Sequence, residues 1–165
     1  MFDDLLEANR RYRATFTDPG VSGRAAKGLA VVTCIDSRIE PLAVLGLKVG
    51  DAKIIRNAGA RITDDTVRSL VIAVNLLNVS RIALLHHTQC AMVTGSDDDM
   101  RERIATASGA DASGLELFTM ADQKAAAASD IAHLRACPLV PVSVEIGAFI
   151  FDVHTGEVSR LLPST

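Results

Sequence analysis

Hydrophobic residues along this chain follow two patterns, short continuous runs and longer stretches with helical spacing. Continuous runs rich in Val, Ile and Leu indicate strands that are buried on both faces of a sheet. Stretches in which apolar residues recur every three or four positions indicate amphipathic helices. The predicted strands cover residues 29–33, 52–56, 81–86, 140–146 and 148–153, and a turn follows at 154–157. The predicted helices cover residues 2–16, 39–47, a segment opening at 63, 96–108 and 122–136.

The helix that opens at Thr63 has the clearest signature. Val67, Leu70, Val71 and Val74 fall on one of its faces, and Asp64 and Asp65 lie in its first turn. A hydroxyl cap followed by acids suits the positive end of a helix dipole.

The order of these elements predicts the fold class. One helix comes first, strands then alternate with helices, and two strands end the chain. That order is typical of an α/β domain with a mostly parallel central sheet flanked by helices. A length of 165 residues suits a single domain over residues 1–165.

Charge and composition narrow the range of partners. The net charge is −3, the basic residues are scattered, and there is no Trp and one Tyr. Neither a basic surface nor stacking platforms for nucleic acid are expected. The apolar runs are far shorter than a membrane span, and the first residues do not resemble a signal peptide. We therefore expect a cytoplasmic protein without nucleic-acid or membrane partners.

The hydrophobic content is high for so short a chain. It reaches 48% of residues, with a mean hydropathy of +0.25. Such a composition indicates either a large core or apolar surface covered by another subunit. The helix over residues 2–16 offers Leu5, Leu6, Ala8 and Tyr12 as contacts. We therefore predict a homodimer or a dimer of dimers.

Three cysteines are an odd number, which favours metal binding or a catalytic thiol over disulfides. Cys34 ends the first predicted strand, and His87 and Cys90 follow the third. If these strands are neighbours, with the second strand on the other side of the first, their carboxyl ends meet where ligands bind in α/β sheets. Two thiolates and one imidazole suit Zn²⁺ and leave a fourth position for water, as in a catalytic site.

Each of these residues taken alone is weak evidence. A cysteine at a strand end is usually part of the core, and a lone His-x-x-Cys occurs by chance. Cys137, which precedes a proline, and His86, His133 and His154 are expected to be structural or surface groups. The metal-site prediction therefore depends on the two strand ends meeting.

Asp36 and Arg38 lie two and four residues beyond Cys34. A carboxylate and a guanidinium at this spacing can form a bidentate pair. An exposed pair contributes little to stability, but its nearness to the predicted ligand favours an active-site role. Asp36 would accept a hydrogen bond from metal-bound water, and Arg38 would keep Asp36 ionised and oriented.

Together these motifs resemble the signature of the β-carbonic anhydrases. The sequence CIDSR at residues 34–38 matches Cys-x-Asp-Ser/Ala-Arg, and HHTQC at residues 86–90 contains the His-x-x-Cys. The segments Ile54–Gly59 and Asp64–Leu70 are also similar to the family. The resemblance is close over residues 29–92, extends to the layout of the rest, and is to the compact prokaryotic members.

The resemblance implies Zn²⁺ on Cys34, His87 and Cys90, an Asp36–Arg38 dyad, and reversible hydration of CO₂ to bicarbonate and a proton through zinc-bound hydroxide. It also implies an obligate dimer with the active-site clefts at the subunit boundary and the N-terminal helix packing on the partner. In the closed form of some members the aspartate becomes a fourth zinc ligand, and the regulated members use a Trp in a bicarbonate pocket. This chain has no Trp, so we expect the open form, with Asp36 off the metal.

Two departures from the family pattern concern positions where glycine is common, here His86 and Ala91. They bear on substrate access more than on metal binding, and His86 adds a titratable group that is a candidate proton shuttle. Two other functions stay open. One is hydrolysis of carbonyl sulfide or carbon disulfide on the same fold, and the other is a non-enzymatic zinc-stabilised regulatory role.

Overall fold

The computed structural model describes residues 1–165 and is organised around one five-stranded sheet in the order β2-β1-β3-β4-β5. The first four strands are parallel, and the last is antiparallel to its neighbour. This confirms the predicted α/β class with a mostly parallel sheet. The strands are β1 (Leu29–Cys34), β2 (Ala52–Asn57), β3 (Arg81–His87), β4 (Glu145–Phe151) and β5 (Val158–Leu162).

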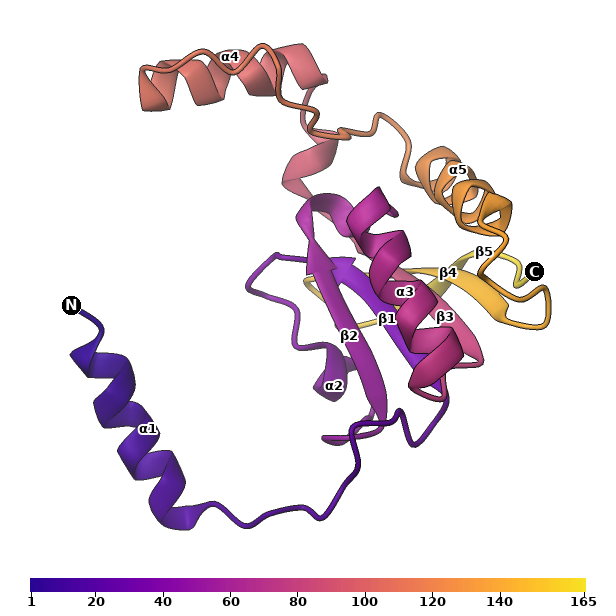
Figure 1. The fold of residues 1–165 in the computed structure, drawn as a ribbon. Helices are drawn as coiled ribbons and strands as arrows, with labels where there is room; N and C mark the ends of the chain where they lie inside the picture. Colours follow the sequence, from indigo (N-terminus) through magenta and orange to yellow (C-terminus); the bar gives the residue numbers. More distant parts are fainter.

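The helices fall into two groups, those packed on the sheet and those that project from it. In Figure 1, α3 and α5 lie over one face of the sheet, whereas α4 and α1 extend away from it. None of the helices is both long and apolar enough to cross a membrane. The helices are α1 (Asp3–Thr15), α2 (Pro41–Val44), α3 (Asp64–Leu76), α4 (Asp97–Ser108) and α5 (Gln123–Ala136), with short 3₁₀ turns η1 (Ala58–Ala60) and η2 (Ala91–Val93).

The helix starts follow the predicted chemistry in part. Ser96 and Asp99 form a reciprocal capping box at the start of α4. Thr63 stands at the N-cap of α3 as expected, but its hydroxyl contacts Thr66 Oγ1 at 3.2 Å instead of the helix backbone. The helix predicted over residues 39–47 is shorter, because Gly46, two residues after the end of α2, has a left-handed φ of 62°.

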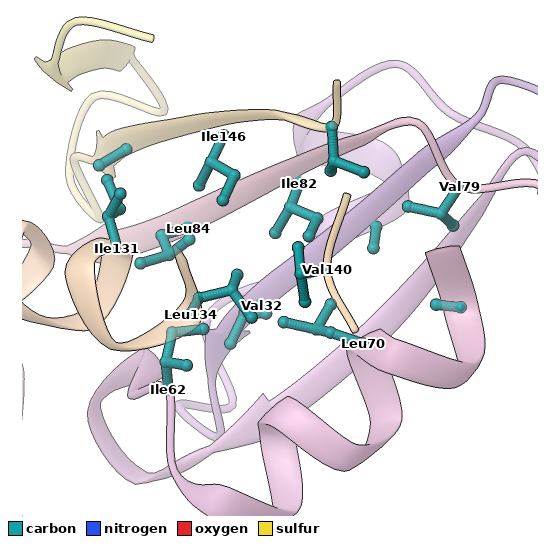
Figure 2. Close-up of a cluster of buried hydrophobic side chains, with 14 of the residues drawn as sticks. Val32, Ile62, Leu70, Val79, Ile82, Leu84, Ile131, Leu134, Val140 and Ile146 are labelled. Carbon is teal, nitrogen blue, oxygen red and sulfur yellow. The ribbon is translucent and has the colours of Figure 1, made fainter. Parts of the chain in front are cut away.

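Side chains from the two faces of the sheet form separate buried layers. On one face, Figure 2 shows Val32, Leu84 and Ile146 of three adjacent strands meeting Leu70 of α3 and Leu134 of α5. Full burial of a leucine contributes roughly 1.5–3 kcal/mol relative to exposure. The layer therefore fixes α3 and α5 against the sheet.

The other face carries a second layer that includes Val31, Leu85 and Phe151 together with Cys34 and Cys90. Ile39, Met92 and Met120, which lie outside the long helices, are the other buried members of this layer. Towards the amino ends of the strands this face stays open, and a cavity of about 470 Å³ is lined by residues such as Leu29 and Phe149. The two faces therefore differ in how completely one chain covers them.

The predictions for the last strands were wrong in part. Instead of strands at residues 140–146 and 148–153, one strand, β4, covers Glu145–Phe151. Val140 and Val144 are buried, but they lie in a turn-containing segment interrupted by Pro141. Their hydrophobicity serves core packing rather than strand pairing. The edge strand β5 was missed, because its half-exposed residues form no continuous apolar run.

The strand order confirms the juxtaposition on which the metal-site prediction depends. β1 pairs with β2 on one side and with β3 on the other. The connections from β1 and from β3 therefore run to opposite sides of the sheet, so the boundary between these two strands is a topological switch point. A hydrogen bond from the Thr33 hydroxyl to the Leu85 carbonyl, 2.9 Å long, ties these two strands together near their carboxyl ends.

Candidate metal centre

Cys34, His87 and Cys90 converge at the carboxyl edge of β1 and β3. Cys34 is the last residue of β1, His87 is the last of β3, and Cys90 immediately precedes η2. All three side chains are buried, and one potential ligand atom from each lies within 4.8 Å of the others. The two sulfur atoms are 4.0 Å apart. Residues separated by more than fifty positions in the sequence thus form one compact donor set.

The loop that carries His87 and Cys90 is held by several hydrogen bonds. Its Thr88 amide donates to the Phe151 carbonyl, and the Gln123 side chain donates to the His87 carbonyl, both at 2.9 Å. Gln89 adopts a left-handed φ of 55°, so the chain turns back sharply between His87 and Cys90. This turn lets one short loop supply two of the three donors.

The His87 ring is oriented by its own loop. Nδ1 lies 2.8 Å from the Thr88 carbonyl, to which it donates as the protonated nitrogen. Nε2 is buried and has no hydrogen-bond partner. A buried nitrogen without a partner is costly in a protein interior. Metal-bound histidines usually donate their other nitrogen to a carbonyl or carboxylate in this way, so the ring fits a metal that is bound through Nε2.

The two thiols strongly influence each other. The hydrogen bond with Cys90 lowers the pKa of Cys34 well below its ordinary value, against the effect of burial, and the same contact raises the pKa of Cys90. Burial lowers the pKa of His87, but its interactions with Cys34, the Thr88 carbonyl and Asp36 together outweigh that effect and raise the pKa. Two adjacent thiolates repel each other unless a cation lies between them. The donor set as a whole therefore fits a soft or borderline divalent cation such as Zn²⁺.

Asp36 and Arg38 form the bidentate pair expected from their spacing. Arg38 Nε donates to Asp36 Oδ1 at 3.0 Å, and Nη2 donates to Oδ2 at 2.7 Å. These bonds hold the pKa of Asp36 far below its ordinary value. Asp36 Oδ2 is also 3.8 Å from His87 Nδ1. The carboxylate thus stands beside the donor set while facing its guanidinium partner.

Gln89 contributes to this arrangement in a way that the sequence analysis missed. Its side-chain oxygen accepts from Arg38 Nη1 at 3.2 Å, and its carbonyl accepts from Nη2 at 3.4 Å. The guanidinium therefore bridges the Cys34 loop and the His87–Cys90 loop. Only the position of Gln89 inside the His-x-x-Cys motif could have drawn attention to it.

His86 does not fit the proton-shuttle role considered from the sequence. It is only 1% exposed, and alternation along β3 places it on the same face as Leu84, away from the donor set. Burial lowers the pKa of His86 to about 4. A group without solvent contact and with so low a pKa is poorly suited to passing protons to buffer.

The other residues set aside in the sequence analysis lie outside the donor set. Cys137 is half-buried after α5 and takes no part in the cluster. His133 Nε2 lies 3.5 Å from Asp64 Oδ1, and His154 is an exposed residue of the turn before β5.

Known proteins are similar to this chain in fold and in sequence. The family model described as carbonic anhydrase matches residues 29–158. A β-carbonic anhydrase 1 from Mycobacterium tuberculosis is 35% identical, with 98% of each chain covered. The crystal structure of a carbonic anhydrase from Streptococcus mutans superposes with a TM-score of 0.91 at 37% identity, covering 98% of this chain and 97% of that one. A carbon disulfide hydrolase from Acidithiobacillus thiooxidans is 29% identical, over 79% of this chain and 75% of its own.

Proposed function

This chain belongs to the β-carbonic anhydrases, a family of lyases, and we propose that it catalyses the reversible hydration of CO₂ to bicarbonate and a proton. The observation that carries the proposal is the buried Cys34–His87–Cys90 donor set with the Asp36–Arg38 pair beside it. In this proposal Cys34, His87 and Cys90 hold one Zn²⁺ ion.

Zinc, when bound, lowers the pKa of a coordinated water and so supplies a nucleophile for CO₂ near neutral pH. Two thiolates neutralise more of the metal charge than imidazoles do, so the acidifying effect is smaller here than with three histidines. Correct orientation of the water by the protein therefore matters more. We assign that task to Asp36, which has a lone pair available for a hydrogen bond from the water.

Arg38 keeps Asp36 ionised and in place. Its guanidinium and its backbone amide together make three hydrogen bonds to the Asp36 carboxylate. Charge-assisted bidentate bonds of this kind are about twice as strong as neutral ones. To become a fourth metal ligand, Asp36 would have to break them. This supports a resting state near neutral pH with Asp36 on Arg38 and off the metal.

Hydrolysis of carbon disulfide or carbonyl sulfide is a second candidate, favoured by the identity to a carbon disulfide hydrolase. These molecules are linear like CO₂, and the apolar side chains of Ile39, Met92 and Met120 pack in the same buried layer as Cys34 and Cys90. An apolar wall accepts either kind of substrate. Both reactions need an activated water, so the ionised Asp36 beside the donor set suits either of them. The higher identity and fuller coverage of the β-carbonic anhydrase relative favour CO₂ as the substrate.

A homodimer, alone or as a dimer of dimers, is part of the same proposal. Leu5, Leu6 and Tyr12 of α1 are each more than half exposed, and no residue of α1 is buried. The open face of the sheet likewise presents apolar residues. We propose that α1 of each chain packs on its partner, which would cover surface that a single chain leaves exposed.

A cytoplasmic location completes the proposal. Both sulfur donors must stay reduced to bind a metal, and the Cys34 and Cys90 sulfur atoms are only 4.0 Å apart. Reducing compartments keep such neighbouring thiols from forming a disulfide.

Stopped-flow measurement of CO₂ hydration, with the metal quantified in the same sample, tests the proposal. We expect about one zinc per chain and hydration activity that is lost on chelation and restored by zinc. Faster release of H₂S from carbon disulfide or carbonyl sulfide than hydration of CO₂ would favour the second candidate. A full complement of zinc with neither activity would contradict both and indicate a zinc-stabilised regulatory protein.

A further inference from the structure

We propose that the buried Arg61–Asp130 ion pair is a positioning device for the metal ligand Cys34, acting through the backbone amide of Gly59. The inference rests on the ligand role proposed above for Cys34. Arg61 and Asp130 touch neither the donor set nor the Asp36–Arg38 pair in any hydrogen bond of the structure. Their effect would pass through the short turn η1, which lies between them and the sulfur.

The contact with the sulfur comes from the middle of η1. The Gly59 amide donates to Cys34 Sγ at a distance of 3.4 Å. A hydrogen bond to a thiolate withdraws charge from the sulfur, and such contacts tune how strongly a thiolate donates to its metal. The direction of this amide is therefore a property of the metal site.

The turn that aims the amide is strained. Gly59 has a φ of 81°, and the following Ala60 has a φ of 61°. The left-handed region costs a residue with a Cβ about 1 kcal/mol or more. Such a conformation persists only where surrounding contacts impose it, and the side chains of Asn57 and Arg61 make such contacts beside η1.

Asn57, at the end of β2, provides the inner restraint. Its side-chain oxygen accepts from the Arg61 amide at 2.8 Å, and its side-chain nitrogen donates to the Arg61 carbonyl at 2.7 Å. The same nitrogen donates to the Thr66 hydroxyl at 3.0 Å. One side chain thus closes the turn by binding both backbone groups of Arg61 and connects it to α3.

The Arg61 side chain provides the outer restraint. Its Nε and Nη2 donate to the two carboxylate oxygens of Asp130 in α5, at 2.8 and 3.0 Å. The two side chains are 12% and 6% exposed. A further bond runs from Arg61 Nη1 to the Phe118 carbonyl. The turn is therefore fastened to α5 and to the segment before it.

A buried ion pair is weak evidence for stability, because removing two charges from water is costly. The fixed fork geometry of the pair is better suited to orienting the chain that carries it.

Sulfur-containing side chains pack around the middle of the turn. A Cβ placed on Gly59 would lie 2.7 Å from Met120 Cε and 3.2 Å from Met92 Cγ. Met120 and Met92 therefore pack closely against Gly59 and leave no room for a larger residue there without their moving.

The variant Asp130→Asn tests this proposal, because it keeps the size of the side chain while removing its charge and one of two acceptors. We expect zinc affinity, measured by competition with a chromophoric chelator, to fall about 10–100-fold. In the cobalt-substituted protein we expect a shift of the sulfur-to-cobalt charge-transfer band. A purely structural role for the pair would not move that band in a protein whose circular dichroism is unchanged.

The matched control is Asp65→Asn, which breaks an exposed pair with Arg68 of similar length, 2.7 Å. It should alter neither affinity nor spectrum. If Asp130→Asn fails to fold, the variant Arg61→Lys tests the proposal instead, because lysine keeps the positive charge but cannot make two parallel hydrogen bonds to Asp130. The same fall in zinc affinity and the same shift of the charge-transfer band are expected. Wild-type affinity and an unshifted band in the folded variant would overturn the proposal. Wild-type protein that binds no metal through Cys34 would instead refute the proposed function.

Discussion

The donor set and the helix α1 lie at opposite extremes of solvent exposure in this chain. Cys34, His87 and Cys90 are buried, and His87 Nε2 has no hydrogen-bond partner. The residues of α1 are all exposed, among them Leu5 and Leu6. A buried set of such donors is suited to binding a small cation, whereas an exposed helix with apolar side chains is suited to packing on another protein surface.

The two regions also differ in what holds them in place. The donor set lies at the ends of two paired strands, and its loop is held by hydrogen bonds with Gln123 of α5 and with Phe151 at the end of β4. In Figure 1, α1 stands apart from the sheet at the end of an extended segment. Because different contacts hold the two regions, changes in one region should leave the other unaffected. The following experiments test that separation.

The largest effect is expected for Cys90→Ser. Loss of one of three protein ligands should reduce the zinc content from about one per chain to a small fraction, with activity falling in parallel. Elemental analysis and stopped-flow assays of the same sample measure both. Cys137→Ser is the matched control, since Cys137 lies outside the donor set and should leave both unchanged. Full zinc occupancy in Cys90→Ser would refute the ligand assignment.

Arg38→Ala should have the next largest effect. Without its partner Asp36 loses its orientation and is free to approach the metal, so we expect about 10–100-fold lower kcat/KM with zinc retained. Arg68→Ala, which removes an arginine from an exposed pair with Asp65, should change little. Unchanged turnover in Arg38→Ala, or a crystal structure at neutral pH with Asp36 bound to zinc, would show that the proposed resting state is wrong.

Leu6→Glu should weaken self-association without affecting the metal. In the proposed dimer Leu6 is buried against the partner, and losing the burial of one leucine costs about 1.5–3 kcal/mol. The dissociation constant of the dimer should therefore rise roughly tenfold or more. Light scattering over a dilution series measures the shift towards a 17.5 kDa species. Arg11→Gln, a polar change on the same helix, is the control. A wild-type protein that is a stable, active monomer would remove the dimer proposal.

The smallest effect concerns Asp97, at the start of α4. Bonds from the Thr119 hydroxyl and from the Leu117 and Thr119 amides lower the pKa of Asp97 to about 2. Because the folded pKa lies below the unfolded one, this stabilisation is complete above about pH 4 and is lost as pH falls towards 2. Asp97→Asn should therefore cost about 1 kcal/mol at pH 7 and progressively less in acid.

Urea denaturation at several pH values, with zinc content measured alongside, checks this prediction. Asp98→Asn is the control, because that neighbouring side chain is 91% exposed. A difference between Asp97→Asn and wild type that grows as pH falls would contradict the assigned sign. Loss of zinc in the variant would show that α4 and the donor set are coupled more tightly than we propose.

Local patterns in the sequence determined most of the elements and the chemistry of the site. Continuous apolar runs identified β1, β2 and β3, and helical spacing identified α3, because burial on two faces or one leaves a regular signal over a few residues. The Asp36–Arg38 pair follows from proximity along the chain. The meeting of Cys34 with His87 and Cys90 followed from a general rule of α/β topology, which the strand order confirms.

Only the tertiary structure decided the features that join distant residues. The apolar residues Val140 and Val144 predicted a strand, but they pack in the core without strand partners. The strand β5 forms because it pairs antiparallel with β4. The bridge from Arg38 to Gln89 and the pair of Arg61 with Asp130 span 51 and 69 residues. Such contacts leave no periodic trace in the sequence, because each depends on where the folded backbone places two single side chains.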